Sequence, residues 1–168
     1  SRERGLSAEI RIKLLAVVTE AVGFAGMVGG QALDMAAEGA SLTIEELGQI
    51  HRQKTGALIR AAILSGALCA DADDTDIAHL DRFAGAIGLA FQVADDILDV
   101  TQSSSTLGKT AGKDLAVEKC TYVRHLGLEG AQAEAERLLA EALDSLSRYG
   151  DRAAALADLA VAMVRRET

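Results

Sequence analysis

The sequence contains no proline, and aromatic residues make up only 3% of its 168 positions. Proline interrupts helices, whereas aromatic and β-branched side chains favour strands. Alanine and leucine, both strong helix formers, recur throughout the chain. This composition argues against a β-sandwich or barrel and predicts an all-α protein. A hydrophobic share of 49% over this length suits one globular domain, residues 1–168, with a sizeable core.

Basic clusters and paired cysteines are also scarce. The formal net charge is -8 and the longest basic run is Arg165 with Arg166, which argues against a nucleic-acid partner. Cys69 and Cys120 have neither CxxC spacing nor a secretory context, so we expect thiols in a reducing compartment. The sequence shows no signal-peptide pattern and no apolar run of about 18 uninterrupted residues. We therefore expect no membrane span and a cytoplasmic location.

The chain does have a group of acidic residues at helical spacing near its middle. Gln92, Asp95, Asp96 and Asp99 fall at i, i+3, i+4 and i+7, which predicts that all four share one face of a helix. Like charges one turn apart repel by roughly 0.2–0.5 kcal/mol, and the nearest lysine, Lys109, lies outside this helix. Magnesium would remove that repulsion, because it prefers oxygen ligands and bridges to phosphate. A solvated acidic face is the simpler alternative.

The predicted helices begin at capping residues and end at glycines or polar runs. Thr43 and Glu46 have the form of a capping box, and the polar run 102–106 is expected to end the helix that carries the aspartates. Four glycines between positions 23 and 30 cost about 1 kcal/mol each relative to alanine, which favours close helix packing there. We expect helices from Ser7 through the glycine-rich segment to Asp34, from Thr43 to Leu68, from Ile77 to Val100, from Lys119, from Ala131 to Arg148, and from Asp151 to Arg166.

Basic residues on other segments are candidates to neutralise a ligand that the aspartates share. Lys54 stands beside Thr55 in a mostly apolar helix, and burying a lysine alone costs several kcal/mol. Either an ion pair with a neighbouring acid or a bound phosphate would compensate the charge of Lys54. Lys109 and Lys113 lie in a predicted loop, 107–114, that lacks the G-x-x-x-x-G-K-[ST] pattern, so a nucleotide-binding P-loop is excluded.

Gln31 and Asp34 lie one turn apart in the glycine-rich segment. They form either a local polar pair or part of the same cavity as the aspartates.

Four motifs, in this order and spacing, resemble a known family. The chain resembles the C-terminal half of short-chain trans-prenyl diphosphate synthases, most nearly the bacterial farnesyl diphosphate synthases. The resemblance implies the helical bundle of the isoprenoid synthases, of which residues 1–168 would form the C-terminal part of a single domain. The motifs are Gly29-Gly-Gln-Ala-Leu-Asp34, Lys54-Thr-Gly-Ala-Leu-Ile59, Phe91-Gln-Val-Ala-Asp-Asp-Ile-Leu-Asp99 and Leu107-Gly-Lys109.

The resemblance also implies a set of site residues and a reaction. It assigns Asp95, Asp96 and Asp99 to the second aspartate-rich motif, which holds Mg²⁺ bridged to the allylic diphosphate. The residues that would bind substrate are Gln31, Lys54, Thr55, Gln92, Lys109 and Lys113, with Lys119 as a further candidate and Lys54 and Lys109 as the catalytic pair. The family ionises geranyl or dimethylallyl diphosphate, adds isopentenyl diphosphate and loses a proton. The full-length protein would then be a homodimeric, Mg²⁺-dependent farnesyl diphosphate synthase.

The sequence departs from the family in one respect. It lacks the first aspartate-rich motif and the Lys, Arg and His set for isopentenyl diphosphate, both of which lie in the N-terminal half of family members. We therefore expect the chain to be a piece of such an enzyme. A non-catalytic helical module that binds diphosphate or a partner is the alternative. A ferritin-type di-metal bundle is excluded, because it needs Glu-x-x-His pairs, which this sequence does not contain.

Overall fold

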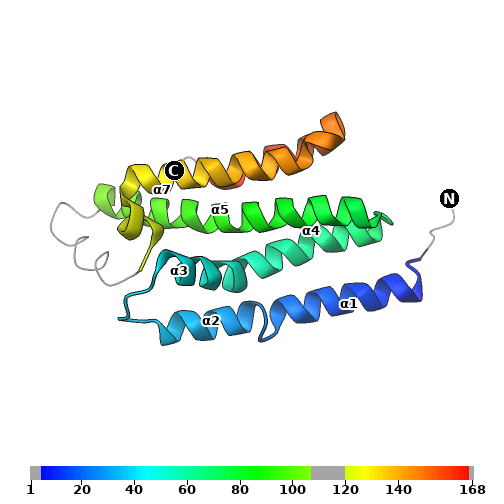
Figure 1. Ribbon diagram of the computed structural model, residues 1–168, viewed down its shortest axis with the longest axis horizontal. Helices are drawn as coiled ribbons and strands as arrows, with labels where there is room; N and C mark the ends of the chain where they lie inside the picture. The colour runs from blue at the N-terminus through cyan, green and yellow to red at the C-terminus, as the bar shows by residue number, and fades with distance from the viewer. Residues whose placement is uncertain (1–4, 107–119, 167–168) are drawn as a thin grey trace.

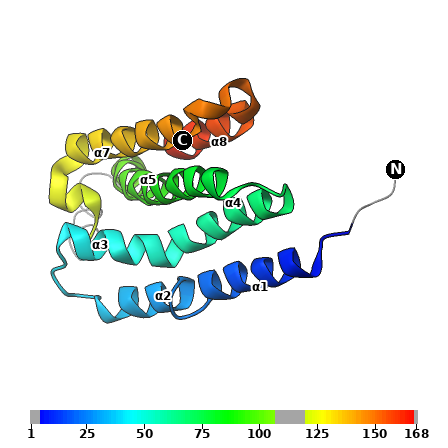
Figure 2. The same cartoon turned by 45° about the vertical axis from the view of Figure 1, so that its right-hand side comes forward.

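A computed structural model describes residues 5–106 and 120–166, and these residues form helices joined by turns, without a strand (Figures 1 and 2). The all-α prediction is confirmed. The elements are α1 (Ala8–Val22), α2 (Met27–Ala36), α3 (Ile44–His51), a π-helical turn (Arg52–Gly56), α4 (Ala57–Cys69), α5 (Asp74–Thr106), α7 (Tyr122–Leu146), a 3-10 segment (Ser147–Ala153) and α8 (Ala154–Val164).

The helices stack in layers with α5 at the centre. The pair α1 and α2 forms one outer layer, α3 and α4 lie between it and α5, and α7 with α8 covers the opposite side (Figures 1 and 2). The core lies between α5 and α7, where Ile87 and Val93 of α5 and Leu139 of α7 are the largest fully buried side chains. The central position of α5 places its predicted site residues next to several other helices.

The predicted caps are present. The Ser7 hydroxyl accepts a hydrogen bond from the Ile10 amide at 3.2 Å and begins α1. Thr43 and Glu46 form the reciprocal capping box that begins α3, with bonds of 2.8 and 3.2 Å. These bonds satisfy backbone N–H groups that a helix start would otherwise leave without partners.

A π-helical turn interrupts the long helix formed by α3 and α4. It contains Lys54 and Thr55, and it ends at Gly56. Gly30 of α2 packs directly on it, since a Cβ atom at Gly30 would lie 2.3 Å from the Lys54 backbone nitrogen. Gly88 of α5 approaches from another side, where a Cβ atom would lie 3.0 Å from the Gly56 Cα. The expected close helix packing is therefore found, and it fixes the backbone that carries Lys54.

Several predicted helix boundaries were wrong. The helix predicted from Ile77 to Val100 extends over Asp74–Thr106. Its start lies earlier because the Asp73 carboxylate accepts a hydrogen bond from the Asp76 amide at 2.8 Å. The helix also continues past its predicted stop at the polar run 102–106. Just before this run, the Thr101 hydroxyl donates to the Ile97 carbonyl at 3.0 Å.

The two helices predicted between Lys119 and Arg148 are present as the two parts of α7, which meet at the non-helical Gly127 with φ 72°, before the predicted second start at Ala131. The helix predicted from Asp151 begins instead with the 3-10 segment, and α8 starts at Ala154.

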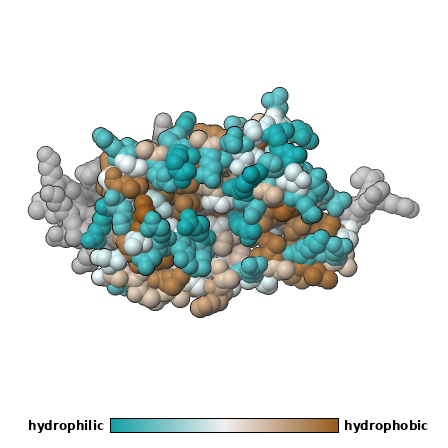
Figure 3. All heavy atoms as spheres, viewed as in Figure 1, coloured by the Kyte–Doolittle hydropathy of each residue, from teal (hydrophilic) through white to brown (hydrophobic). Residues whose placement is uncertain are grey.

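The outer layer exposes many apolar side chains. Within the stretch Ala8–Ala36, an 18-residue window has a mean hydropathy of 1.6, and the stretch is long and apolar enough for a membrane span by length and composition, a test that core helices of soluble proteins also pass. The expectation of no membrane span rested on uninterrupted apolar runs, whereas a mean hydropathy over a window also admits charged residues. Figure 3 shows pale and brown residues along the lower edge, where α1 and α2 lie in Figure 1. The exposed large apolar residues of α1, α2 and the turn between them form a set that we call the outer apolar face: Ile12, Leu15, Val18, Val22, Phe24, Val28, Leu33 and Met35.

Candidate functional site

The π turn and α5 bring two of the predicted motifs into contact. The Thr55 hydroxyl donates a hydrogen bond to the Gln92 side-chain oxygen at 2.7 Å, across 37 positions of sequence. Both side chains are partly buried. This bond joins the Lys54-Thr55 motif to the aspartate-rich motif, so the sequence prediction that these residues gather in one place is supported by geometry.

Lys54 also connects the π turn to α2. Its Nζ lies 2.6 Å from Oδ2 of Asp34, and the two side chains are 35% and 38% exposed. Of the two alternatives left open by the sequence, the ion pair is therefore formed in this structure. An ammonium group has three N–H donors, and this contact uses one of them. Gln31, one turn before Asp34, is exposed on the same helix.

The three aspartates of the motif on α5 differ in exposure. The Asp95 side chain is 46% exposed and Asp99 is exposed, but the Asp96 side chain is only 4% exposed. The expectation that all of them share one face is corrected for Asp96, because adjacent residues of a helix are rotated by about 100°. No group of three or more His, Cys, Asp or Glu suited to a metal occurs within residues 5–106 and 120–166. The metal-binding role of the aspartates stays a prediction.

Asp96 contacts two residues in the protein interior. Its Oδ2 accepts a hydrogen bond from the Tyr122 backbone N–H at 2.8 Å, and His51 Nε2 lies 3.5 Å from the same oxygen. The rings of His51 and Tyr122 stack with centroids 5.8 Å apart. Burial raises the pKa of the Tyr122 phenol, with smaller effects from nearby charges. Sequence reasoning missed this cluster, although the spacing of His51 from Leu47 and Ile50 places it on the buried side of α3.

Arg166 is a second residue that sequence reasoning missed. Its guanidinium lies 4.4 Å from the centre of the Phe91 ring, and its Nη2 is 3.5 Å from Oδ1 of Asp95. Phe91 is only partly buried, beneath this arginine. The structure thus places one positive charge beside Asp95, one of the two exposed carboxylates of the motif.

The remaining predicted residues lie outside the described part of the chain. Lys109, Lys113 and Lys119 belong to residues 107–119. Their assignment to the diphosphate stays a prediction from the sequence.

The chain matches known proteins along most of its length. The family model described as polyprenyl synthetase matches residues 5–159. The farnesyl diphosphate synthase of Escherichia coli (strain K12) is 48% identical over 143 residues, which are 84% of this chain and 48% of that protein. The geranylgeranyl diphosphate synthase of Cyanophora paradoxa is 41% identical over 167 residues, or 99% of this chain and 56% of that protein.

Solved structures share the fold. An FPP/GFPP synthase from Zymomonas mobilis superposes with a TM-score of 0.82 at 32% identity, covering 94% of this chain and 52% of that one. A geranyltransferase from Helicobacter pylori, complexed with magnesium and isoprenyl diphosphate, gives a TM-score of 0.76 at 34% identity, covering 97% of this chain and 54% of that one.

The chain therefore belongs to the polyprenyl synthetase family, and both the predicted family and the isoprenoid synthase fold are confirmed. It spans about half the length of the curated relatives that it matches.

Proposed function

We propose that this chain forms the diphosphate-binding side of a prenyltransferase, and that the full-length protein is a Mg²⁺-dependent farnesyl diphosphate synthase. Its substrates would be isopentenyl diphosphate and geranyl or dimethylallyl diphosphate. The observation that carries the proposal is the 2.7 Å hydrogen bond between Thr55 and Gln92. This bond unites two motifs that family resemblance assigns to the same diphosphate, and Lys54 lies beside them on the same π turn.

The exposed carboxylates fit a magnesium ion that is shared with a substrate. Mg²⁺ is usually held by one or two carboxylates together with substrate phosphates, and it keeps several waters. Asp95 and Asp99 are the aspartates of the motif that reach the surface. When bound there, Mg²⁺ would supply positive charge that offsets the negative charge of the departing pyrophosphate. The remaining N–H donors of Lys54 would hold the same group, and charged groups fixed in advance are the most effective kind of stabilisation.

Calorimetric titration with geranyl diphosphate tests the proposed site. We expect binding in the presence of Mg²⁺, loss of binding in EDTA, and weaker binding by Asp95→Ala, because the aspartates repel a diphosphate when no cation is present. Asp158→Ala, an exposed aspartate on α8, is the matched control and should bind like the wild type. Equal affinity in Mg²⁺, in EDTA and in Asp95→Ala would contradict the assignment.

A non-catalytic diphosphate-binding or partner module is the second candidate, favoured by the missing first aspartate-rich motif. Under either proposal the chain alone should not condense geranyl and isopentenyl diphosphates. Removing one preorganised electrostatic partner typically lowers kcat by about 10²–10³, and here the whole first aspartate-rich motif is missing. Farnesyl diphosphate formed at about 1 per second in a radiolabel assay would show that this half contains a complete site. Restoration of that rate by the full-length gene product would favour the enzyme over the module.

A further inference from the structure

Asp96 is the aspartate of the motif that the structure buries, and its contacts are with the protein itself. We propose that Asp96 is a positioning residue and not a metal ligand. It holds the start of α7 and, next to His51, the end of α3 against α5, which sets the distance between the Lys54–Thr55 pair and Asp95. The inference deepens the proposed function and rests on it for the site that Asp96 positions.

The first contact is with the start of α7. The first N–H groups of a helix have no partner within the helix, and negative charge near that end is favourable. The Thr121 hydroxyl caps one of them, the Arg124 N–H, at 3.2 Å. Asp96 accepts another, the Tyr122 N–H, at 2.8 Å with both residues buried. Asp96 therefore acts as a second cap for α7, supplied from α5 across 26 positions of sequence.

The second contact is with the end of α3. His51 is the last residue of α3, and its Nε2 lies 3.5 Å from the Asp96 oxygen that Tyr122 also contacts. This Nε2 is buried and has no hydrogen-bond partner within the described residues. Its ring stacks on that of Tyr122. The π turn begins at the next residue, so His51 lies about one helical turn before Lys54.

These contacts are incompatible with direct metal binding on the side of Asp95. Asp95 is 46% exposed, and the neighbouring Asp96 side chain is rotated away from it by about 100°. A move of the Asp96 carboxylate toward that surface would leave the Tyr122 N–H buried without an acceptor. Burial of an unsatisfied group of this kind is strongly unfavourable. The aspartates of the motif therefore have two roles: Asp95 and Asp99 face the ligand, and Asp96 holds α7 and α3 against α5.

Three variants test this division: Asp96→Asn, Asp96→Ala and Asp95→Asn. The metal probe is Mn²⁺ with inorganic pyrophosphate, followed by electron paramagnetic resonance, since Mn²⁺ takes the same oxygen ligands as Mg²⁺. Hydrogen exchange of the Tyr122 amide reports the cap without any metal. Asparagine keeps an oxygen that can accept from Tyr122, whereas alanine does not.

We expect Asp96→Asn to bind Mn²⁺ within about twofold of the wild type and to keep Tyr122 protected from exchange. Asp95→Asn should weaken Mn²⁺ binding about tenfold or more with Tyr122 still protected, in line with the 1.4 kcal/mol of a tenfold change. Asp96→Ala should expose the Tyr122 amide and weaken binding of Mn²⁺ with pyrophosphate, and Asp96→Asn should restore both. If Asp96→Asn lost as much affinity for Mn²⁺ as Asp95→Asn does, the inference would be overturned. It would also be overturned if the Tyr122 amide stayed as protected from exchange in Asp96→Ala as in the wild type. Failure of the wild type to bind Mn²⁺ would instead contradict the proposed function, and Tyr122 exchange would still decide the role of Asp96.

Discussion

Lys54 sits in a position where it can serve two negative groups. Its ammonium lies 2.6 Å from the Asp34 carboxylate, and about a third of each side chain remains exposed. An exposed ion pair of this kind contributes about 0–1 kcal/mol to stability, because water and salt screen both charges. The contact orients the ammonium toward α2 and leaves donors for a ligand. The ion pair and phosphate binding, which the sequence presents as alternatives, are therefore compatible.

We predict that Lys54→Ala weakens binding of geranyl diphosphate about tenfold to a hundredfold. A hydrogen bond to a charged group is worth about 1.5–3 kcal/mol, and each 1.4 kcal/mol changes affinity tenfold. The melting temperature should change little. Titration calorimetry and thermal unfolding measure the two effects. Lys13→Ala, which removes the exposed ion pair with Glu9 on α1, is the control and should leave affinity intact. A large loss of stability with unchanged affinity would show that Lys54 serves only the ion pair.

Some site residues could be predicted from the sequence and others could not. Lys54 was found because a lysine in an apolar helix requires a partner, and Gln92 was found from its helical spacing with the aspartates. Thr55 was assigned through the family resemblance. Asp96 was placed on the wrong face because spacing alone does not tell which of two adjacent carboxylates turns inward. That choice depends on Tyr122, which offers an amide 26 positions later. The position of Arg166 was missed for the same reason, since its partners are set by how α8 returns toward α5.

At the scale of elements, close packing of α2 on the π turn supports the site. A Cβ atom at Gly30 would lie 2.3 Å from the Lys54 nitrogen, which is backbone and cannot swing away. We predict that Gly30→Ala destabilises the protein by about 1–3 kcal/mol and weakens diphosphate binding, since α2 must move away from Lys54.

Chemical denaturation and titration calorimetry check the two effects. The matched control is Gly66→Ala in α4, where an added Cβ would meet nothing within 4 Å. That change should stabilise the protein by about 0.5–1 kcal/mol through better helix propensity. Equal effects of the two substitutions would contradict the close contact at Gly30.

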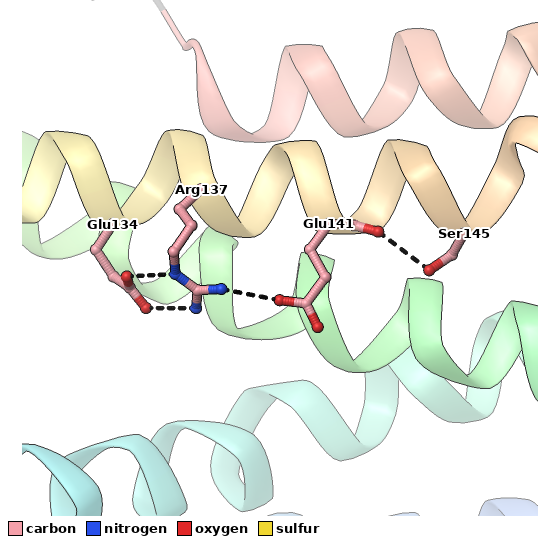
Figure 4. A network of polar contacts seen from close by, with 4 residues as sticks. All are labelled: Glu134, Arg137, Glu141 and Ser145. Atoms are coloured by element: carbon pink, nitrogen blue, oxygen red, sulfur yellow. Dashed lines mark hydrogen bonds and ion pairs between the residues drawn. The ribbon is translucent and has the colours of Figure 1, made fainter.

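Charge pairs on α7 give a prediction about pH. Figure 4 shows the Arg137 guanidinium between Glu134 and Glu141 on α7, with hydrogen bonds of 2.8–3.0 Å. The bond from Arg137 lowers the pKa of Glu134 below its ordinary value of 4.5. Arg165 lowers the pKa of Glu136 in the same way.

A carboxyl whose pKa is lower in the folded state stabilises the fold above its unfolded pKa, and the contribution is lost as pH falls through the folded value. The stability advantage of the wild type over Arg137→Gln should therefore be small, at most about 1 kcal/mol, and should shrink below pH 4.5. Thermal unfolding of both proteins between about pH 3 and pH 6 measures it. A difference that does not change with pH would assign the effect to packing of the Arg137 stem.

The helix content of these elements was predictable, whereas their boundaries were less so. The capping box at Thr43 follows from local chemistry, so sequence spacing identified it. The break between the two predicted helices lies at Gly127, which adopts a positive φ of 72°, and not just before Ala131 as predicted. A glycine in the sequence indicates a break of this kind but does not fix where the next helix begins.

At the scale of the whole molecule, α1 and α2 form an outer layer that is covered on one side. They pack on α4 and the π turn, and the outer apolar face is exposed on their other side. Phe24 is 83% exposed there, which is costly for an aromatic side chain. The solved relatives whose fold matches are nearly twice as long as this chain. Composition alone could not predict this surface, because it does not tell which apolar helix face lacks a partner.

We predict that the purified chain self-associates through the outer apolar face. Contiguous exposed apolar patches of this kind favour association, and association then raises the apparent stability with protein concentration. The double variant Ile12→Glu with Phe24→Glu should shift the chain toward monomer in sedimentation velocity experiments, with little change in helix content, because both side chains are exposed already. The control is Leu159→Glu, an exposed leucine on α8, which should leave association unchanged. Association that persists in the double variant and disappears in the control would place the contact on α8 instead.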